Sequence, residues 1–262
     1  MKVGYIQTAP IFGEKEQNFA QVEELLKNVK ADLIVLPELF ATGYTFVSKE
    51  EAKSLAEVKD GITAQFLKKM ANRTGAVIVG GFIEKENSEI YNSAMLVSDT
   101  SVIGIYRKIH LYYKENLWFS PGNLLLEVFK IKGFKVGMMI CFDWIFPETA
   151  RTLALLGADI IAHPANLVLP YCQKAMVTRC LENRVFAVTS NRIGEESRGE
   201  DAFNFTGASQ ITSFNGSILS SAPKDKAHID IVEIDVKNAR NKNLNELNNL
   251  FTDRRIDYYF KG

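Results

Sequence analysis

The stretch KVGMMICFDWIFPETARTLALLGADIIAHP, residues 135–164, predicts a strand, a helix and a second strand in succession. The apolar runs at its two ends suit buried strands. Between them, Pro147 and Glu148 suit the first turn of a helix, and Gly157 suits the position just past its end. We therefore expect a βαβ unit whose helix covers residues 147–156.

A similar stretch occurs near the start of the chain. KVGYIQT (2–8) resembles KVGMMIC (135–141), and KADLIVLP (30–37) resembles GADIIAHP (157–164). An amphipathic helix is expected over residues 16–29. Chance is one explanation, because all βαβ units share the same periodicities. Two matched segments in the same order favour a repeat instead, with two α/β halves whose mixed sheets pack together as a four-layer sandwich.

The first half continues to alternate between strands and helices. Residues 32–36 are a continuous apolar run that suits a strand buried on both faces. A helix is expected over 63–74, because Gly75 suits its end. Further strands are expected over residues 76–82, 91–97 and 102–107. No low-complexity linker separates the halves, so we interpret residues 1–262 as a single domain with a C-terminal tail at 238–262.

The charge balance argues against several classes of protein. The 262 residues contain 31 Lys and Arg and 31 Asp and Glu, so the formal net charge is zero. Proteins that bind nucleic acids or membrane surfaces usually carry an excess of positive charge, which attracts these anionic partners over long distances. No apolar run approaches the roughly 20 residues of a membrane span, and the first residues lack the apolar region of a secretory signal. We expect a cytoplasmic protein that binds neither nucleic acid nor membranes.

The cysteines and histidines give no sign of a disulfide or a metal site. Cys172 and Cys180 are eight residues apart in a helix-like segment, which separates them by about 12 Å at 1.5 Å per residue. A disulfide needs its Cα atoms within about 7 Å. Spacings such as CxxC or HxH, which bind zinc, do not occur. We expect no metal and no cofactor, and we interpret these two cysteines as core or interface residues.

Three predicted strand ends carry residues capable of chemistry: Glu38, Lys108 and Cys141. In open α/β sheets, ligands gather at the carboxyl ends of strands. Each residue also has an ordinary interpretation. A glutamate after a strand is usually solvated, a cysteine usually packs in the core, and a single lysine is seldom catalytic. Taken one at a time, none of them identifies a site.

Four longer stretches contain or follow these residues: IVLPELFATGY (34–44), YRKIHLYYKENLWFSPGN (106–123), GMMICFDWIFPETARTLALLGADIIAHPAN (137–166) and RCLENRVFAVTSNRIG (179–194). Together they resemble the nitrilase superfamily of carbon–nitrogen hydrolases, in the family's order and over most of the chain. The resemblance implies an α/β fold, a four-layer αββα sandwich of two mixed sheets with outer helices. This expectation agrees with the repeat.

The resemblance also implies a role for each residue. Glu38 matches the family's general base, Lys108 the residue that stabilises the oxyanion, and Cys141 the nucleophile. Glu115 matches a second glutamate that positions the lysine and the substrate, although it also suits an ordinary surface charge. A thiol with the usual pKa of about 8.5 is mostly unreactive at pH 7, so a nearby base or positive charge is needed. The backbone N–H of Phe142 is a candidate second donor to the oxyanion.

Motif position further suggests substrate-binding residues: Phe40, Tyr44, Phe142, Trp144, Ala165 and Asn166. For the aromatic residues, packing in the core is an equally good interpretation. His163 suits a papain-like Cys–His dyad, but the family uses a glutamate as base, so we interpret His110 and His163 as structural. Glu182 and Arg184 are expected to form a buried charge pair that fixes a helix.

We expect a cofactor-free amidase that hydrolyses a small amide or carbamoyl amine through a thioester on Cys141. The products are ammonia and a carboxylic acid. The alternative is a nitrilase that converts a small nitrile with the same three residues. Asp143, in CFDW, matches amidase and carbamoyl-amidase branches, but an archaeal-type nitrilase branch also resembles it, so the choice stays open. A catalytically silent binding protein is disfavoured, because Glu38, Lys108 and Cys141 are all present.

The last twenty residues, NLNELNNLFTDRRIDYYFKG, mix aromatic and charged side chains and do not suit a core helix. Comparable tails in the family often cross to a partner subunit. The resemblance therefore implies a homodimer or a larger even homo-oligomer, with residues 238–262 in the subunit contacts.

Overall fold

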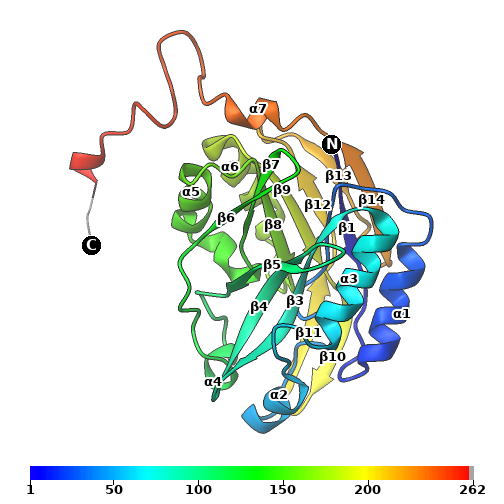
Figure 1. Ribbon diagram of the computed structural model, residues 1–262. Coiled ribbons are helices and arrows are strands. Elements are labelled where there is room, and N and C mark those ends of the chain that lie inside the picture. The colour runs from blue at the N-terminus through cyan, green and yellow to red at the C-terminus, as the bar shows by residue number, and fades with distance from the viewer. Residues whose placement is uncertain (260–262) are drawn as a thin grey trace.

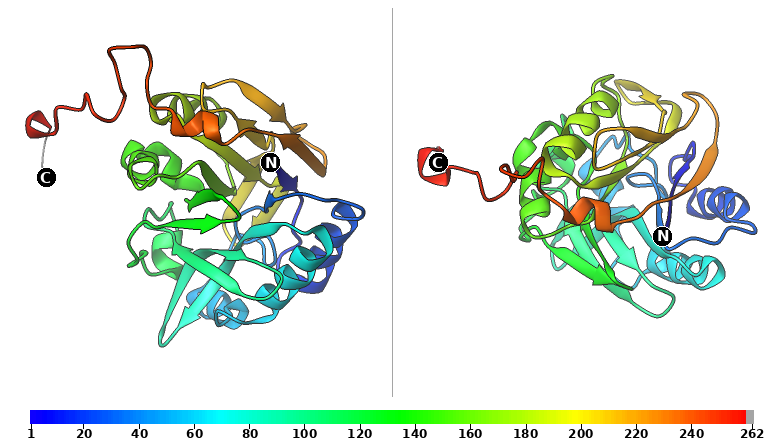
Figure 2. Two further views of the ribbon diagram at one scale, coloured as in Figure 1. Left: turned by 45° about the horizontal axis from the view of Figure 1, so that its top comes forward. Right: turned by 90° about the horizontal axis from the view of Figure 1, so that it is seen from above.

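Two six-stranded mixed sheets face each other in the computed structural model, which describes residues 1–259. Helices cover the outer face of each sheet, as the ribbon in Figure 1 shows. The two further views in Figure 2 separate the layers into helices, sheet, sheet and helices. This is the αββα sandwich expected from the sequence.

The first sheet has the strand order β14-β1-β2-β3-β4-β5, and the second has the order β13-β12-β9-β8-β7-β6. The strands of the first sheet are β1 (Lys2–Gln7), β2 (Leu33–Val35), β3 (Val77–Glu86), β4 (Glu89–Val97), β5 (Val102–Arg107) and β14 (His228–Glu233). Those of the second are β6 (Val128–Ile131), β7 (Phe134–Met138), β8 (Ile160–Ala165), β9 (Phe186–Asn191), β12 (Gln210–Thr212) and β13 (Ile218–Ser221). A separate hairpin consists of β10 (Ile193–Arg198) and β11 (Asp201–Thr206).

The helices pack on the outside of the two sheets. α1 and α3 cover the first sheet, and α5 and α6 cover the second. The α-helices are α1 (Lys15–Leu25), α2 (Lys49–Leu55), α3 (Ile62–Thr74), α4 (Glu115–Trp118), α5 (Pro147–Leu155), α6 (Cys172–Asn183) and α7 (Lys237–Arg240). Two short 3₁₀ helices are η1 (Cys141–Ile145) and η2 (Ile256–Tyr258).

Both sheets are built by the same succession of strand pairings. In the first, β1, β2 and β3 are parallel, β4 and β5 continue antiparallel, and β14 pairs antiparallel with β1. In the second, β7, β8 and β9 are parallel, β12 and β13 continue antiparallel, and β6 pairs antiparallel with β7. α1 and α5 occupy equivalent positions, as do α3 and α6. The prediction of two similar α/β halves is confirmed.

Alternation along β2 shows how the layers are filled. Leu33 and Val35 belong to the core between the two sheets, whereas Ile34 belongs to the layer beneath α1 and α3. All three side chains are fully buried, as expected for a strand covered on both faces. Pro37 has no N–H to donate to a neighbouring strand. Its carbonyl still accepts from the Gly81 N–H at 3.3 Å, and beyond Pro37 the chain turns, with a left-handed φ of 47° at Leu39.

Two predicted boundaries differ from the structure where the backbone turns. The predicted helix 16–29 is shorter, as α1, because Asn28 takes a left-handed φ of 64°. The predicted strand 135–141 ends as β7 at Met138, and Cys141 instead opens η1. The early end of β7 moves Cys141 out of the hydrogen-bonded ladder and into a turn.

After α7 the chain leaves the sandwich and extends away from it, at the upper left of Figure 1. This segment exposes apolar side chains, with exposed fractions of 57% for Leu244, 89% for Leu247 and 77% for Tyr258. Residues 260–262 of the predicted tail lie outside the described residues. The partner contacts expected of residues 238–262 stay a prediction. In the described part of the chain, no helix combines the length and the apolar character needed to cross a membrane.

Candidate active site

The predicted catalytic residues come from both halves of the sandwich. Glu38 follows β2, Lys108 follows β5 and Glu115 opens α4, whereas Cys141 opens η1 directly after β7 of the second sheet. All four are buried, with exposed fractions of 0%, 1%, 3% and 6% in that order. The site therefore forms where the two halves meet.

Lys108 lies between two carboxylates. Its Nζ donates to Glu38 Oε1 and to Glu115 Oε1, each at 2.7 Å. Burial disfavours the ammonium form, but Glu115 and Glu38 outweigh it and raise the pKa of Lys108 above its ordinary value. Lys108 is therefore a cation held in one place.

Glu38 has one bound and one free oxygen. Its Oε1 accepts from Lys108 Nζ and from Asn92 Nδ2, both at 2.7 Å. Its Oε2 is buried and has no hydrogen-bond partner among residues 1–259. Leaving a buried acceptor unpaired costs free energy, so this oxygen is available to take a proton from a thiol or a water molecule.

Glu115 is buried and forms an ion pair with Lys108, so it is not a surface charge. Its Oε1 also accepts from the Tyr44 hydroxyl at 2.7 Å, and its Oε2 accepts from the Tyr112 backbone N–H at 3.2 Å. Burial raises the pKa of the Tyr44 hydroxyl well above its ordinary value, which keeps it a donor. Burial also raises the pKa of Glu115, while Lys108 acts in the opposite direction.

Cys141 lies in a turn that other residues hold in place. Its φ of 40° is left-handed, a conformation that costs free energy for any residue with a Cβ. Asp143 Oδ2 accepts from the Ile140 N–H at 2.8 Å and from the Tyr106 hydroxyl at 2.7 Å. His163 Nε2 donates to the Cys141 carbonyl at 3.0 Å. These contacts tie the turn to β5 and β8 and stabilise the strained backbone.

The surroundings of Cys141 keep its thiol protonated. Burial raises the pKa of the thiol well above its ordinary value, and the charges of Glu38 and Glu115 act in the same direction. Lys108 and a hydrogen bond from the Asn166 backbone N–H lower this pKa but do not outweigh the burial. The nucleophilic form is the thiolate, so the thiol needs a base, and Glu38 Oε2 is the free acceptor.

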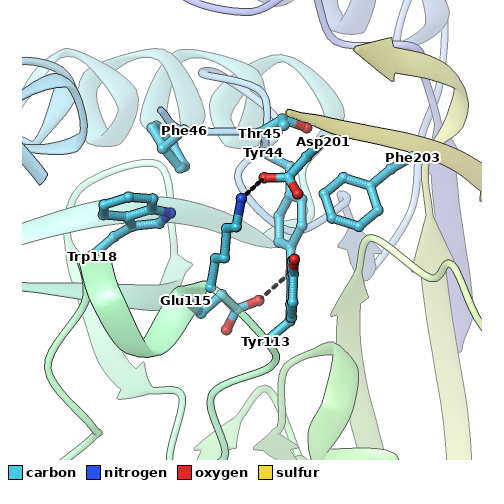
Figure 3. A pocket seen from close by; sticks show the side chains of 9 residues that line it. Tyr44, Thr45, Phe46, Tyr113, Glu115, Trp118, Asp201 and Phe203 are labelled. Carbon is cyan, nitrogen blue, oxygen red and sulfur yellow. Dashed lines mark hydrogen bonds and ion pairs between the residues drawn. The ribbon is translucent and has the colours of Figure 1, made fainter. Parts of the chain in front are cut away.

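Two pockets adjoin these residues. One is lined by Tyr112, Cys141, Phe142, Trp144, Asn166, Leu167, Val168 and Leu169. The other is lined by Tyr44, Thr45, Phe46, Tyr113, Lys114, Glu115, Trp118, Asp201 and Phe203. Figure 3 shows this second pocket, with Tyr44 directed at Glu115 and with Trp118 and Phe203 on facing walls. Cys141 lines the first pocket, and Glu115 lines the second together with Tyr44.

The carbon-nitrogen hydrolase family model matches residues 2–243. The chain belongs to this family. It is 48% identical to a nitrilase of Pyrococcus abyssi over 100% of both chains, and 33% identical to an (R)-stereoselective amidase of a Pseudomonas species over 90% of this chain and 85% of that one. A crystal structure of a carbon-nitrogen hydrolase from Helicobacter pylori matches with a TM-score of 0.87 at 26% identity, over 99% of this chain and 97% of that one. The protein is therefore a carbon–nitrogen hydrolase.

Most of the predicted substrate-binding residues of this hydrolase line one of the pockets. Phe142, Trp144 and Asn166 line the pocket at Cys141, and Tyr44 lines the neighbouring one. Ala165 is fully buried at the end of β8 and, in the part of the chain that is described, lines neither.

Phe40 belongs to the core of the hydrolase, which was one of the two interpretations of this residue from the sequence. Its ring centroid lies 6.0 Å from that of Phe19 and 6.3 Å from that of Phe66. The side chain is buried in the apolar layer between the first sheet and its helices. Between Glu38 and Phe40 the chain turns at Leu39, which has a left-handed φ of 47°, and this turn separates the charged site from the outer layer.

His163 and His110 both support the turn, as interpreted from the sequence. Because the Cys141 carbonyl can only accept, His163 Nε2 carries the proton and Nδ1 accepts from Thr189 Oγ1 at 3.1 Å. Burial lowers the pKa of His163 to about 4, so the ring is neutral at pH 7. His110 Nδ1 lies 2.7 Å from Asp143 Oδ1. The nitrogens of His163 are thus occupied by groups other than the thiol.

The expected buried pair of Glu182 and Arg184 does not form. Glu182 pairs with Arg179 at 3.1 Å, one turn earlier in α6, and Arg184 donates to the Asn241 carbonyl. α6 ends at Asn183, and Arg184 takes a left-handed φ of 45°. The two side chains therefore leave the backbone on different sides of the helix end.

The other two cysteines are core residues. Cys172 and Cys180 are fully buried in the apolar cluster around the second sheet, and both are free thiols. Burial raises the pKa of each thiol. Residues 1–259 contain no group of three or more His, Cys, Asp or Glu side chains placed to hold a metal ion.

Three residues of the site were not singled out from the sequence. Asn92 binds one oxygen of Glu38, Tyr112 forms part of the Cys141 pocket, and Glu196 accepts from the Tyr44 backbone N–H at 3.0 Å. Asn92 carries a usable signal, because it is a polar residue within the apolar strand β4 and is 1% exposed. Tyr112 and Glu196 have no such signal, because their environments are set by other segments.

Proposed function

We propose that the hydrolase cleaves a small amide through a thioester on Cys141, releasing ammonia and a carboxylic acid. With a carbamoyl amine, the intermediate is a thiocarbamate on Cys141, and the products are ammonia, carbon dioxide and the amine. One observation carries this proposal. Glu38 keeps a buried, unpartnered oxygen, and its charge acts on the Cys141 thiol, whose pKa is raised by burial, while its other oxygen accepts from Lys108 and Asn92. A fixed base next to a protonated nucleophile is the arrangement that general-base activation needs.

In the first half-reaction, Glu38 Oε2 takes the thiol proton as the sulfur of Cys141 attacks the carbonyl carbon. The C=O electron pair moves onto oxygen, where Lys108 Nζ and the Phe142 backbone N–H stabilise the charge. When the C–N bond breaks, Glu38 returns the proton to the departing nitrogen, and ammonia leaves. The acyl group remains on sulfur as a thioester.

In the second half-reaction, a water molecule attacks the thioester carbon. Glu38 removes a proton from that water, Lys108 again stabilises the oxyanion, and the C–S bond breaks. The sulfur of Cys141 recovers the proton from Glu38, and the carboxylic acid is released. General-base help of this kind is worth about a hundred- to ten-thousand-fold in rate.

Glu115 acts through Lys108 in this mechanism. Its 2.7 Å contact with Lys108 Nζ fixes the direction of the ammonium, and Tyr44 and Tyr112 fix Glu115 in turn. A cation held in place before the oxyanion forms needs no reorganisation at the moment of reaction. We therefore assign Glu115 a positioning role, with Tyr44 as its support.

Nitrile hydrolysis is the second candidate function, and the 48% identity to a protein named nitrilase favours it. The same three residues serve it: Cys141 adds to the nitrile carbon, and a thioimidate precedes the thioester. Asp143 does not separate the two reactions, because it is fully buried and bound to the turn and to Tyr106. A silent binding protein is set aside by the match to hydrolases over the whole chain.

We also propose a homodimer or a larger even assembly. The segment after α7 extends away from its own sandwich and exposes Leu244, Leu247 and Tyr258. A surface of another subunit that covered these side chains would remove them from water, which is favourable.

The test is a panel of small amides, carbamoyl amines and nitriles, with ammonia release as the measurement and Cys141→Ala as the control. Release from amides or carbamoyl amines, with none from the Cys141→Ala protein, is the expected result. Turnover of nitriles alone would support the second candidate, and equal release by Cys141→Ala would contradict both.

A further inference from the structure

The pocket at Cys141 has apolar walls and few polar side chains. Among the described residues, no Asp, Glu, Lys, Arg or His lines it. Apart from Cys141, the side chains with a hydrogen-bonding group are those of Tyr112, Trp144 and Asn166. A charged group on a substrate would lose its water here without gaining an ion pair, which is costly. The pocket therefore suits an uncharged acyl group.

Asn166 contributes a buried side-chain amide to this pocket, and both of its polar atoms lack a hydrogen-bond partner among residues 1–259. It is 2% exposed, and in the described part of the chain neither its Nδ2 nor its Oδ1 has a partner. Buried amides are normally paired. Asn191 shows the contrast, because its Oδ1 accepts from the Leu167 N–H at 2.8 Å and its Nδ2 donates to the Gly207 carbonyl at 2.6 Å. The amide of Asn191 is thus paired within the protein, whereas the amide of Asn166 is free to bind a ligand in the pocket.

Asn166 also lies next to the reacting sulfur. Asn166 and Cys141 line the same pocket. In the proposed mechanism, Lys108 and the Phe142 N–H take the carbonyl oxygen. The side-chain amide of Asn166 is left for a group on the acyl chain of the substrate.

Building on the proposed function, we propose that Asn166 determines specificity by binding an uncharged hydrogen-bonding group on the acyl chain next to the scissile carbon. The amide offers one acceptor and two donors, so a hydroxyl group can pair with either of its atoms. A methyl group in that place would leave Nδ2 and Oδ1 unpaired, and an ammonium or carboxylate would lack a counter-ion. The substrate class is therefore a short, neutral, hydroxyl-bearing amide, or the corresponding nitrile.

Glycolamide and propionamide test this directly, because they differ by a hydroxyl in place of a methyl group at similar size. The kcat/KM ratio of glycolamide to propionamide should be roughly two- to tenfold in the wild type, the range for one neutral hydrogen bond. In Asn166→Leu, which keeps the approximate volume and removes both polar atoms, the ratio should fall below one. In Asn166→Asp, the new carboxylate can pair with the ammonium of glycinamide. The kcat/KM for glycinamide should therefore rise relative to the values for glycolamide and propionamide.

Val168→Ala is the matched control, because Val168 lines the same pocket and is apolar. It should change both rates alike and leave their ratio within twofold of the wild type. Glycolonitrile and propionitrile give the same comparison if nitriles are the substrates. A wild-type ratio of one or less, or a ratio that Asn166→Leu does not change, would overturn the role of Asn166.

Failure of the inference and failure of the proposed function give different results. If no compound releases ammonia, the proposed function is wrong. Calorimetric binding of glycolamide and propionamide to the Cys141→Ala protein then still tests Asn166 without turnover. Weaker or equal binding of glycolamide would refute the inference, and stronger binding that Asn166→Leu abolishes in that background would support it. Circular dichroism of each variant shows whether it is folded.

Discussion

Replacing Glu38 by glutamine removes a proton acceptor and leaves the surrounding contacts in place. The amide oxygen of glutamine can still accept from Lys108 Nζ and Asn92 Nδ2, which lie 2.7 Å from Glu38 Oε1. The change falls on Oε2, the oxygen without a partner among residues 1–259, which becomes an NH₂ group. The variant therefore tests the loss of the general base without the loss of the hydrogen bonds that hold residue 38 in place.

The expected losses follow from this geometry. Each half-reaction loses a general base worth about a hundred- to ten-thousand-fold, or ~3–5 kcal/mol of activation free energy. The charge of Glu38 also raises the pKa of the Cys141 thiol, so Glu38→Gln should lower that pKa and increase the thiolate fraction at a given pH. Acylation by an activated ester, whose leaving group needs no proton, should then be less impaired than hydrolysis of the thioester.

Two measurements check this prediction. With p-nitrophenyl acetate, intact-protein mass spectrometry should show an acetyl adduct on Cys141 that accumulates in Glu38→Gln and not in the wild type. The rate of alkylation by iodoacetamide should reach its half-maximum at lower pH in the variant. Glu24→Gln is the control, because the Glu24 side chain is 75% exposed in a surface pair, and it should match the wild type.

Wild-type turnover of the thioester in Glu38→Gln would refute the role of Glu38 as base. An alkylation profile shifted to higher pH would contradict the electrostatic argument, since removal of an adjacent negative charge must favour the thiolate. If His163→Asn instead accumulated the adduct while Glu38→Gln turned over normally, the histidine would be the base.

Three further predictions follow from burial and charge. Cys141→Ala should abolish ammonia release, whereas Cys172→Ala and Cys180→Ala should keep it, because both of those thiols are core residues; activity of purified Cys141→Ala would contradict this. His163 has its pKa lowered to about 4, against about 6.5 unfolded, so the stability it confers is complete above pH 6.5 and decreases toward pH 4 by up to about 3 kcal/mol. The denaturant midpoint of the His163→Asn variant should no longer decrease in this way between pH 6.5 and pH 4. If the variant's midpoint decreased with pH as steeply as that of the wild type, the prediction would be refuted. Deletion of residues 243–262 should shift the protein toward monomer and lower its stability, whereas an unchanged mass by sedimentation would count against the tail contacts.

The fold and the strand-end residues were predictable because local signals mark them. An apolar run followed by Pro37 marks the end of β2 and hence Glu38, and Gly157 marks the end of α5. The repeated KVG and ADxI segments placed two equivalent βαβ units in one chain. Such signals depend on a few neighbouring residues, so they can be read without the partner segments.

The contacts that complete the site depend on distant segments and were not predictable in this way. Asn92 and Glu38 are 54 residues apart, and Glu196 and the Tyr44 backbone are 152 apart. The core position of Phe40 and the error in the pair of Glu182 with Arg184 have a different cause. Each depends on one left-handed residue that is not glycine, Leu39 in the first case and Arg184 in the second, and such residues carry no marker in the sequence.

The pairing of β14 with β1 has a consequence for how the chain folds. Lys2 is opposite Glu233, and the amino group of Met1 donates to the Ile234 carbonyl at 2.7 Å. During synthesis, β1 emerges from the ribosome before β14, the strand that pairs with its edge. Until residue 233 has emerged, that edge is open to pairing with other nascent chains. At high expression, the unpaired edge of β1 should therefore favour aggregation of chains in which β14 has not yet paired.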